Sequence, residues 1–497
     1  MSTNDHAAFS GRITEAPSAV LDREILRPQF DYELAHLLPF YLAIEKASLN
    51  ASVALGVMAP DEAATIGAAL DKISATTLQA DPTRNFSDIS FAIERMVAEQ
   101  LTAEVPTWHV DKSRNDFQAC AQRMFARSRV LQSVGLLERL SVAIVAVAER
   151  TADLPMPGYT HYQAAQVITP GFYLVSVNEA VVSTMRRLLA AYADLNQSPL
   201  GAGAMAGLEL PWDRAQMARD LGFDAPVRSA LASVSDRDWT LKISFEFALL
   251  GTAISRFCTD LSMWGSSEYG FIDLPDALAG ISSAMPQKKN FTILERIRGE
   301  TSHLASLHLD FMLGQRNTPY TNLVEVSKEA GRYLATLFGH IDRIATLLTL
   351  VIEQISFRAD RMREACERDY YGGFALANAL TLRSGIPYRT AQIIAGEFIR
   401  AAIAAQTRPS EVRLDALREI AEKRGYGLDL SQEQLRELFD VTANLTGKHS
   451  AGSTQPAQVR AMLAEQQGER DQIMREWSSR EQQVSAALSR LGSSSAA

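Results

Sequence analysis

The stretch Trp239–Leu261 reads "WTLKISFEFALLGTAISRFCTDL" and carries an apolar stripe. Its members recur every three or four residues: Trp239, Ile243, Phe247, Leu250, Ile254, Phe257 and Leu261. This period places them on one face of an α-helix. The chain around them has no proline from Val227 to Leu274, and proline breaks helix interiors. The stretch therefore predicts one long, uninterrupted helix.

Three more windows without proline cover residues 107–154, 171–198 and 320–386. They are rich in residues that favour helix, and alternating strand patterns are scarce. A helix of 35 to 40 residues is roughly 50 to 60 Å long, so several must pack side by side as a bundle. Segments such as "FEFALLGTAISRF" are apolar on two faces, which predicts neighbours on both sides and hence subunit association. We therefore predict an all-α chain whose central bundle is built from several copies.

Breaks in the helical pattern divide the 497 residues into three predicted units. They are an N-terminal helical unit, a central long-helix unit and a C-terminal helical unit: residues 1–112, 113–365 and 366–497. The last contains "LANALTLRSGIPYRTAQIIAGEFI", which predicts a helix pair hinged at Gly385 and Pro387.

Composition excludes some classes of protein. The formal net charge is -9, and a nucleic-acid-binding protein usually shows a basic domain or stripe. No uncharged apolar run of about 18 residues occurs, so we expect no membrane span. The first residues show no apolar core of a secretory signal. Three widely spaced cysteines, Cys120, Cys258 and Cys366, lack a CxxC pattern and indicate reduced, mostly buried thiols of a cytoplasmic protein.

Polar segments occupy the breaks, and each has a plain and a functional interpretation. "HVDKSRNDFQAC" (109–120) offers Ser113, Arg114 and Asn115 where a long helix begins. Ser113 or Asn115 can simply cap that helix. Alternatively, helix amides, a guanidinium and an amide side chain converge there on a carboxylate.

The segment "PMPGYTHYQAAQ" (155–166) has two prolines and a glycine that fix a bent backbone presenting Thr160 and His161. A lone loop histidine is usually a surface residue, but one held in a rigid turn can transfer protons. By contrast, "SPLGAGAMAGLELP" (198–211) has no dinucleotide-binding pattern and predicts a tight turn or a close helix approach.

Two more polar segments follow. "GISSAMPQKKNFTILERIRGE" (280–300) offers the hydroxyls of Ser282 and Ser283 and about eight donor hydrogens from Lys288, Lys289 and Asn290. It is either a solvated loop or an anion site. "PYTNLVEVSKEAG" (319–331), which carries Tyr320, Glu325 and Lys328, has a solvated helix face as its default interpretation.

Together these segments resemble the argininosuccinate lyase branch of the aspartase/fumarase superfamily. The matching blocks, in order, are "KSRND", "MPGYTHYQAAQ", "PLGAGAMAG", the signature loop "SSAMPQKKN" and the C-terminal "YYGGFALANALTLRSGIPYRTAQIIAG". The resemblance covers roughly residues 20–460. It implies a three-domain, all-α homotetramer with a central multi-helix core, in which blocks from three chains meet at each site.

The resemblance also implies a reaction: reversible anti elimination of fumarate from an N-substituted aspartate, with no metal or organic cofactor. In the signature loop (280–290), Ser282 is then the base. His161 either transfers a proton to the departing amine or positions the substrate. The residues implied to bind substrate are Ser113, Arg114, Asn115, Thr160, Ser283, Met285, Lys288, Asn290, Tyr320, Glu325 and Lys328.

The chain departs from that branch at the amine half of the substrate. The typical D-I-x-G-S-x-A-H block is altered, with Leu42 at its serine. The typical E-D-x-H is "SDIS" (87–90), and Glu325 replaces a glutamine. Leu42 leaves fewer partners for a guanidinium, whereas Glu325 can pair with a protonated amine. We therefore favour an aminopolycarboxylate substrate such as ethylenediamine-N,N'-disuccinate (EDDS), whose second succinyl arm could use Lys112 or Lys328. The alternatives are argininosuccinate lyase and an inactive, crystallin-like structural protein.

Overall fold

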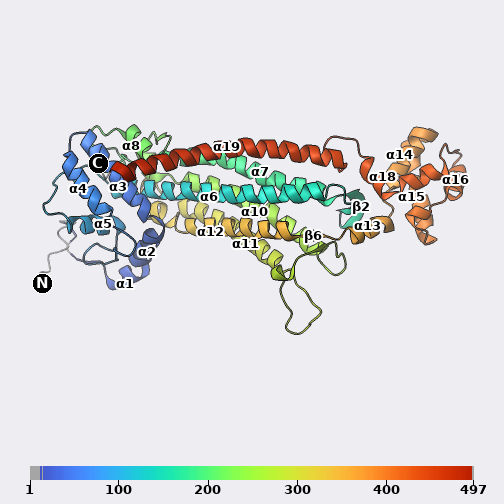
Figure 1. Ribbon diagram of the computed structural model, residues 1–497, viewed down its shortest axis with the longest axis horizontal. Coiled ribbons are helices and arrows are strands. Elements are labelled where there is room, and N and C mark those ends of the chain that lie inside the picture. Colours follow the sequence, from blue (N-terminus) through green and yellow to red (C-terminus); the bar gives the residue numbers. More distant parts are fainter. Residues whose placement is uncertain (1–11, 14, 495–497) are drawn as a thin grey trace.

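The computed structural model describes residues 12, 13 and 15–494. Most of the opening segment, predicted to lack a secretory signal, lies outside these residues. The molecule is elongated, with short helices at each end and long helices between them (Figure 1). This arrangement is the mostly helical fold that the sequence predicts.

Short helical segments form the N-terminal end. They are α1 (Ala19–Leu21), η2 (Asp22–Leu26), α2 (Arg27–His36), α3 (Leu38–Ala54), α4 (Pro60–Leu70) and α5 (Ile89–Ala98). Phe30, Leu37 and Ile44 are at most 1% exposed and join the main core. This end therefore packs onto the long helices as part of one hydrophobic core.

Five long helices form the middle of the molecule: α6 (Arg114–Arg150), α7 (Pro170–Leu195), α10 (Asp238–Trp264), α11 (Thr292–Gln315) and α12 (Leu334–Gln354). Thr169 caps α7, and Pro170 stands at its first position, where the missing amide costs nothing. The predicted stripe on α10 is buried along its whole length, from Trp239 to Leu261. The long helix predicted from that stripe is confirmed.

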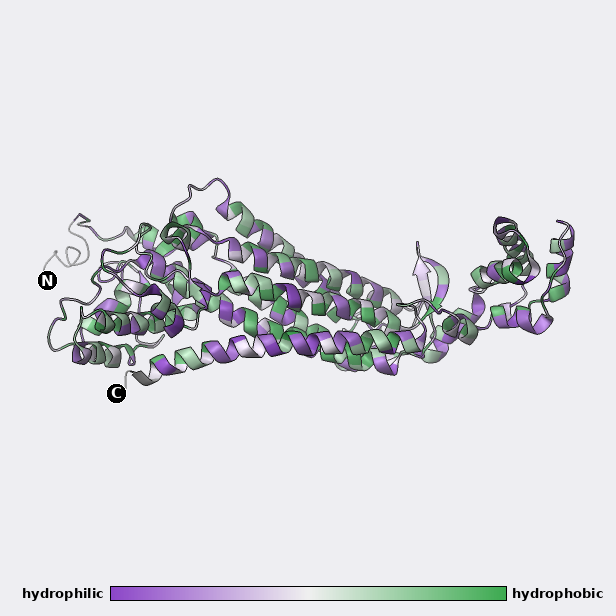
Figure 2. Ribbon diagram, turned by 90° about the horizontal axis from the view of Figure 1, so that it is seen from above, coloured by the Kyte–Doolittle hydropathy of each residue, from purple (hydrophilic) through white to green (hydrophobic). Residues whose placement is uncertain are grey.

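The same helix has a second apolar face that the chain leaves uncovered. Phe245 and Leu249 of α10 are 47% and 41% exposed. On α11, Leu309, Met312 and Leu313 are 42–49% exposed. Figure 2 shows the long helices side by side, with hydrophobic residues recurring along them.

The last helix, α19 (Pro456–Ser494), runs back along the bundle and brings the C-terminus beside the N-terminal end (Figure 1). It packs on α7, α6 and α3. Trp477 anchors it: the indole is 2% exposed, stacks edge-on against Tyr192 at 5.2 Å and donates to the Met185 carbonyl. The sequence-based boundaries at 112 and 365 stay predictions, and α19 packs with the long helices.

The other end of the molecule holds α13 (Ala359–Arg368), α14 (Gly373–Ser384), α15 (Tyr388–Ala404), η5 (Pro409–Glu411), α16 (Leu414–Glu422), α17 (Gln432–Leu438) and α18 (Val441–Thr446). α14 to α17 share a small core of their own. Gly385 ends α14 with φ +68°, a conformation that favours glycine, and Pro387 caps α15. The predicted hinge of the helix pair is confirmed.

Short strands, which the sequence did not predict, join the helices. β1 (Met156–Thr160) and β2 (Gln163–Ile168) form an antiparallel hairpin. β3 (Gln197–Ser198) pairs in parallel with β4 (Ala225–Pro226), and β5 (Ile272–Asp273) pairs antiparallel with β6 (Ser356–Phe357). The hairpin packs against α13 and α18 and so links the bundle to the C-terminal end.

Two helical segments, 114–150 and 325–354, are long and apolar enough to cross a membrane. Both lie in the bundle, where 56% and 44% of their apolar windows are buried. A buried core helix passes the same test of length and composition, so these two segments are only weak evidence for a membrane span.

Candidate active site

The start of α6 gathers the first group of predicted site residues. Ser113 caps the helix, and its hydroxyl accepts from the Asn115 amide at 3.2 Å. Arg114 donates to Asp88 at 2.8 Å and lies over the Phe91 ring, 4.3 Å from its centre. The capping interpretation is therefore confirmed for Ser113. The carboxylate-binding interpretation stays a prediction.

A glycine-containing loop packs against this helix start. The Asp116 carboxylate accepts from the amides of Gly201 and Gly203, at 2.9 and 3.0 Å. Both glycines have positive φ, +79° and +64°, which confirms the predicted tight turn. Burial raises the pKa of Asp116 to about 7, although the two amide bonds oppose that rise. The Asn115 side chain also reaches this loop and donates to the Ala204 carbonyl at 3.1 Å.

The segment after α11 reaches the same end of α6. It forms η4 (Glu325–Glu329), and the Ser327 carbonyl accepts from Gln118 and Gln122 at 3.1 and 2.7 Å. Lys328 donates to Glu33 of α2 at 2.6 Å. Tyr320 is 68% exposed, and Glu325 is exposed as well. One chain thus brings Tyr320, Glu325 and Lys328 to the end of the molecule that holds Ser113, Arg114 and Asn115.

Thr160 and His161 lie at the opposite end of α6, on the tip of the hairpin. His161 and Tyr162 have φ +54° and +59°, so both central residues of the turn are left-handed, as a tight hairpin requires. Both are exposed. A Cβ on Gly158 would approach the Gln166 carbonyl oxygen to 2.9 Å, so only glycine fits there. The predicted rigid turn is thus a strand hairpin that presents His161 to the outside.

The signature loop projects from the side of the bundle between β5 and α11 (Figure 1). Gly280 and Asn290 close its base through two backbone hydrogen bonds of 2.7 and 3.1 Å. Ser282 accepts from the Met285 amide at 3.1 Å, and Ser283 and Met285 are exposed. Hence this loop has its own turn but little contact with the body of the chain.

The two lysines of the loop differ. Lys289 pairs with Asp273 and Asp276, at 3.2 and 3.0 Å, and ties the loop to β5. The side chain of Lys288 has no partner within residues 15–494 and is exposed. Of the two, Lys288 is therefore the cation that remains available to an outside anion.

These groups do not meet within one chain. Ser113 and His161 are separated by the length of α6, 37 residues, or about 55 Å. The signature loop and Tyr320 are separated by α11, 24 residues, or about 36 Å. Within a single copy, the start of α6 with η4 is thus distant from both the hairpin tip and the signature loop.

A family model described as lyase matches residues 11–304. The chain belongs to this lyase family, within the aspartase/fumarase superfamily. It is similar to argininosuccinate lyase from Alkalilimnicola ehrlichii, with 32% identity over 92% of this chain and 96% of the relative. The corresponding enzyme of Saccharophagus degradans is 32% identical over 91% and 94%. The protein is a fumarate-releasing carbon–nitrogen lyase.

Solved structures agree with this lyase fold. An EDDS lyase variant with bound fumarate superposes with a TM-score of 0.85 at 25% identity, over 97% of this chain and 96% of that one. 3-Carboxy-cis,cis-muconate lactonizing enzyme from Pseudomonas putida has a TM-score of 0.68 at 18% identity, over 92% and 100%, which supports the fold alone.

Two acidic residues lie near the start of α6 in this lyase: Asp88, which belongs to the altered "SDIS" block, and Glu33, which escaped the sequence analysis. Glu33 is 2% exposed, and burial raises its pKa while Lys328 opposes that rise. A signal existed in the sequence, because Glu33 shares a helical face with Phe30 and Leu37 (spacing three and four), where a charge is unusual.

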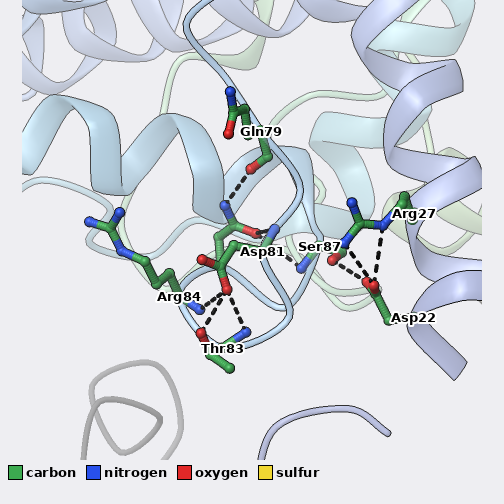
Figure 3. A network of polar contacts seen from close by, with 8 residues as sticks. Asp22, Arg27, Gln79, Asp81, Thr83, Arg84 and Ser87 are labelled. Carbon is green, nitrogen blue, oxygen red and sulfur yellow. Dashed lines mark hydrogen bonds and ion pairs between the residues drawn. The ribbon is translucent and has the colours of Figure 1, made fainter. Parts of the chain in front are cut away.

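Ser87, which stands in the altered "SDIS" block, bonds to the segment before α2. Its hydroxyl donates to Asp22 at 2.5 Å, and Arg27 pairs with the same carboxylate (Figure 3). Figure 3 also shows Asp81 accepting from Thr83 and Arg84 in the loop before Ser87. This network holds the loop, and Asp88, which follows it, is the residue that reaches Arg114.

The other departures lie in different surroundings. Leu42 is half-buried and packs against the main core. Lys112, one of two cations considered for a second succinyl arm, pairs with Glu45 at 3.4 Å, and both side chains are at most 10% exposed. Lys112 is therefore engaged inside the protein. Lys328, the other cation, also has a carboxylate partner.

Proposed function

We propose that this lyase catalyses reversible anti elimination of fumarate from an N-substituted aspartate. The observation that carries the proposal is the signature loop. Its turn carries Ser282 and an exposed Lys288 whose ammonium has no partner among the described residues, and it projects from the bundle. A loop of this kind can close over a substrate and exclude water.

The chemistry requires a base and strong anion-binding groups. The proton on Cβ of a succinyl unit is weakly acidic, and its removal concentrates charge on the adjacent carboxylate. Ser282, as an alkoxide stabilised by nearby cations, takes this proton. The electron pair forms the carbon–carbon double bond, the Cα–N bond breaks, and the amine leaves with a proton. Lys288 and Asn290 hold the carboxylate whose charge grows.

In this proposal the remaining succinyl oxygens are bound by four residues: Ser113, Arg114, Asn115 and Thr160. Ser283 and Met285 line the closed loop, and Tyr320, Glu325 and Lys328 face the amine half. For His161, proton transfer to the leaving nitrogen and positioning of the substrate are both open roles.

The site is assembled from three copies of the chain in a homotetramer. Long helices separate the start of α6 from the hairpin tip and from the signature loop of the same copy by roughly 36 to 55 Å, so in this proposal neighbouring copies supply the missing groups. The exposed apolar faces of α10 and α11 support such an assembly. Each large apolar side chain that a partner covers contributes up to about 1.5 to 3 kcal/mol.

EDDS is our preferred substrate, and argininosuccinate is the second candidate. Leu42 and Glu325 favour EDDS, as does the similarity to an EDDS lyase variant. The argininosuccinate lyases that share 32% identity favour the second candidate. Either reaction fits a cytoplasmic protein whose cysteines, Cys120, Cys258 and Cys366, are free and buried.

The test is to incubate the purified full-length protein with each compound and to follow fumarate by ultraviolet absorbance. Rapid release from EDDS and slow or no release from argininosuccinate is the expected result. The reverse pattern would make argininosuccinate the substrate, and complementation of an arginine auxotroph would then check its role in cells. No fumarate from either compound would refute the proposed reaction for both.

A further inference from the structure

Lys328 is engaged by a buried carboxylate from a distant part of the chain. Its Nζ lies 2.6 Å from Oε1 of Glu33, 295 positions earlier in the sequence. The side chains are 19% and 3% exposed, so little water reaches the pair. The cation that faces the amine half in the proposed function is thus already paired when no substrate is bound.

The surroundings of Glu33 place it beside the start of α6. Gln118, one helical turn beyond Arg114 and on the same face, approaches Glu33 Oε1 at 3.4 Å. The charged groups that act on Glu33 are Lys328, Asp88 and Arg114. The Tyr32 and Tyr41 hydroxyls feel its charge from α2 and α3. Glu33 therefore shares one electrostatic environment with the groups proposed to bind substrate.

We propose that Glu33 is a built-in counter-ion of Lys328, which the distal carboxylate of the substrate displaces, so that Glu33 determines specificity for the amine half. This inference rests on the proposed function. Both candidate substrates carry such a carboxylate: EDDS on its second succinyl arm, and argininosuccinate on its arginine portion.

Displacement has a consequence for protons. A buried carboxylate that loses its cation is strongly penalised unless it becomes neutral. Burial already raises the pKa of Glu33, and Lys328 opposes that rise. When the substrate takes Lys328, the pKa rises further and Glu33 binds a proton. The complex then holds one more proton than the free enzyme, so KM increases with pH above the usual glutamate range near about 4.3.

The experiment compares wild-type protein with Glu33→Gln on EDDS and argininosuccinate, using initial rates of fumarate release. Glutamine keeps the shape and a hydrogen-bonding oxygen but removes the charge that competes for Lys328. We expect KM at alkaline pH to fall about tenfold, with kcat changed less than about twofold. We also expect the rise of KM with pH to disappear in Glu33→Gln. A merely structural role would lower kcat or stability and leave the pH profile of KM unchanged.

Two controls isolate the effect. Glu45→Gln removes another buried partner of a lysine, since Glu45 pairs with Lys112 at 3.4 Å. It should keep the wild-type dependence of KM on pH. N-Ethylaspartate has a succinyl unit but no distal carboxylate. The dependence of its KM on pH should therefore be the same in wild type and in Glu33→Gln. If Glu33→Gln does not fold, the contrast between EDDS and N-ethylaspartate on wild-type protein still decides the question.

The outcomes separate the two proposals. If the KM for EDDS or argininosuccinate rises equally with pH in wild type and in Glu33→Gln, the counter-ion role is overturned. Fumarate release would still support the proposed function. If neither candidate substrate releases fumarate, the proposed function fails, and the same compounds serve as unconsumed ligands for calorimetry in two buffers. Proton uptake on binding to wild type but not to Glu33→Gln would support the counter-ion role. No uptake, or no binding, would refute it.

Discussion

The start of α6 and the signature loop are opposites in how they are held. At the start of α6, Asp116 accepts two loop amides and Glu33 holds Lys328, and all these carboxylate side chains are buried. In the loop, Ser282 contacts only its own turn through the Met285 amide, and Lys288 has no partner within the described chain. The charged groups at the start of α6 thus find their partners within a single copy, whereas Ser282 and Lys288 of the loop are left available to a substrate.

The difference separates binding from chemistry. The start of α6 recognises a fixed charge with side chains that are already held in place, and in our proposal only the partner of Lys328 changes as the substrate binds. A catalytic group that must be shielded from water before it reacts is better placed on a loop that can close over the substrate. We therefore expect substitutions in the loop to change turnover, and substitutions at the start of α6 to change binding and stability.

The largest expected effect comes from Ser282→Ala. If Ser282 is the base, fumarate release should fall by about a thousandfold or more, because the group that takes the Cβ proton is removed. Melting temperature and oligomeric mass should not change, since the side chain makes one hydrogen bond on an exposed turn. Absorbance assays measure fumarate release, thermal unfolding gives the melting temperature, and light scattering gives the oligomeric mass. Unchanged turnover would remove Ser282 from the role of base.

The two loop lysines give the next largest effect, with one as control for the other. Lys288→Ala should lower kcat/KM about a hundredfold, because it deletes an available cation near the growing charge. Lys289→Ala removes an exposed tether to Asp273 and Asp276 and should cost only a few-fold. Equal losses in the two variants, measured by initial rates, would contradict the assignment of Lys288 to the substrate.

The start of α6 should respond to pH. Burial raises the pKa of Asp116 to about 7 in the folded protein, against about 3.9 when unfolded. The folded state then binds the extra proton between these values, so this stabilising contribution is full below about pH 4 and is lost as pH rises through 7. The loss is at most about 4 kcal/mol. Asp116→Asn should flatten the decline of melting temperature between about pH 5 and 8, and an unchanged slope would contradict the shifted pKa.

The sequence predicted the features that depend on local pattern. The stripe on α10 fixed one buried helical face, and the left-handed Gly385 before Pro387 ended a helix as expected. The hairpin was missed because its strands are short and its apolar partners, such as Cys366 and Val441, come from the C-terminal end. The residues of the hairpin form strands because they pack against these C-terminal side chains, which the local sequence does not reveal.

The pair of Glu33 and Lys328 shows a different limit. Its members lie 295 positions apart, and only the folding of α2 and η4 onto α6 brings them within 2.6 Å. A charge among the apolar residues of α2 signals that a partner is needed, but it does not identify the partner. The resemblance indicated Lys328 as a substrate contact, and the structure adds the carboxylate that pairs with it.

The smallest expected effect concerns the network that holds the loop before Asp88. Ser87→Ala removes one hydrogen bond to Asp22, while Arg27 keeps its ion pair with that carboxylate. Stability should fall by about 1 kcal/mol, as for a typical hydrogen bond, seen as a small drop in melting temperature. Fumarate release should stay within about twofold, because Asp88 still caps α5 and still reaches Arg114. A large loss of activity without a loss of stability would instead place Ser87 in contact with the substrate. The hydrogen bonds of the free chain near the start of α6 would then not be the ones that hold in the complex with substrate.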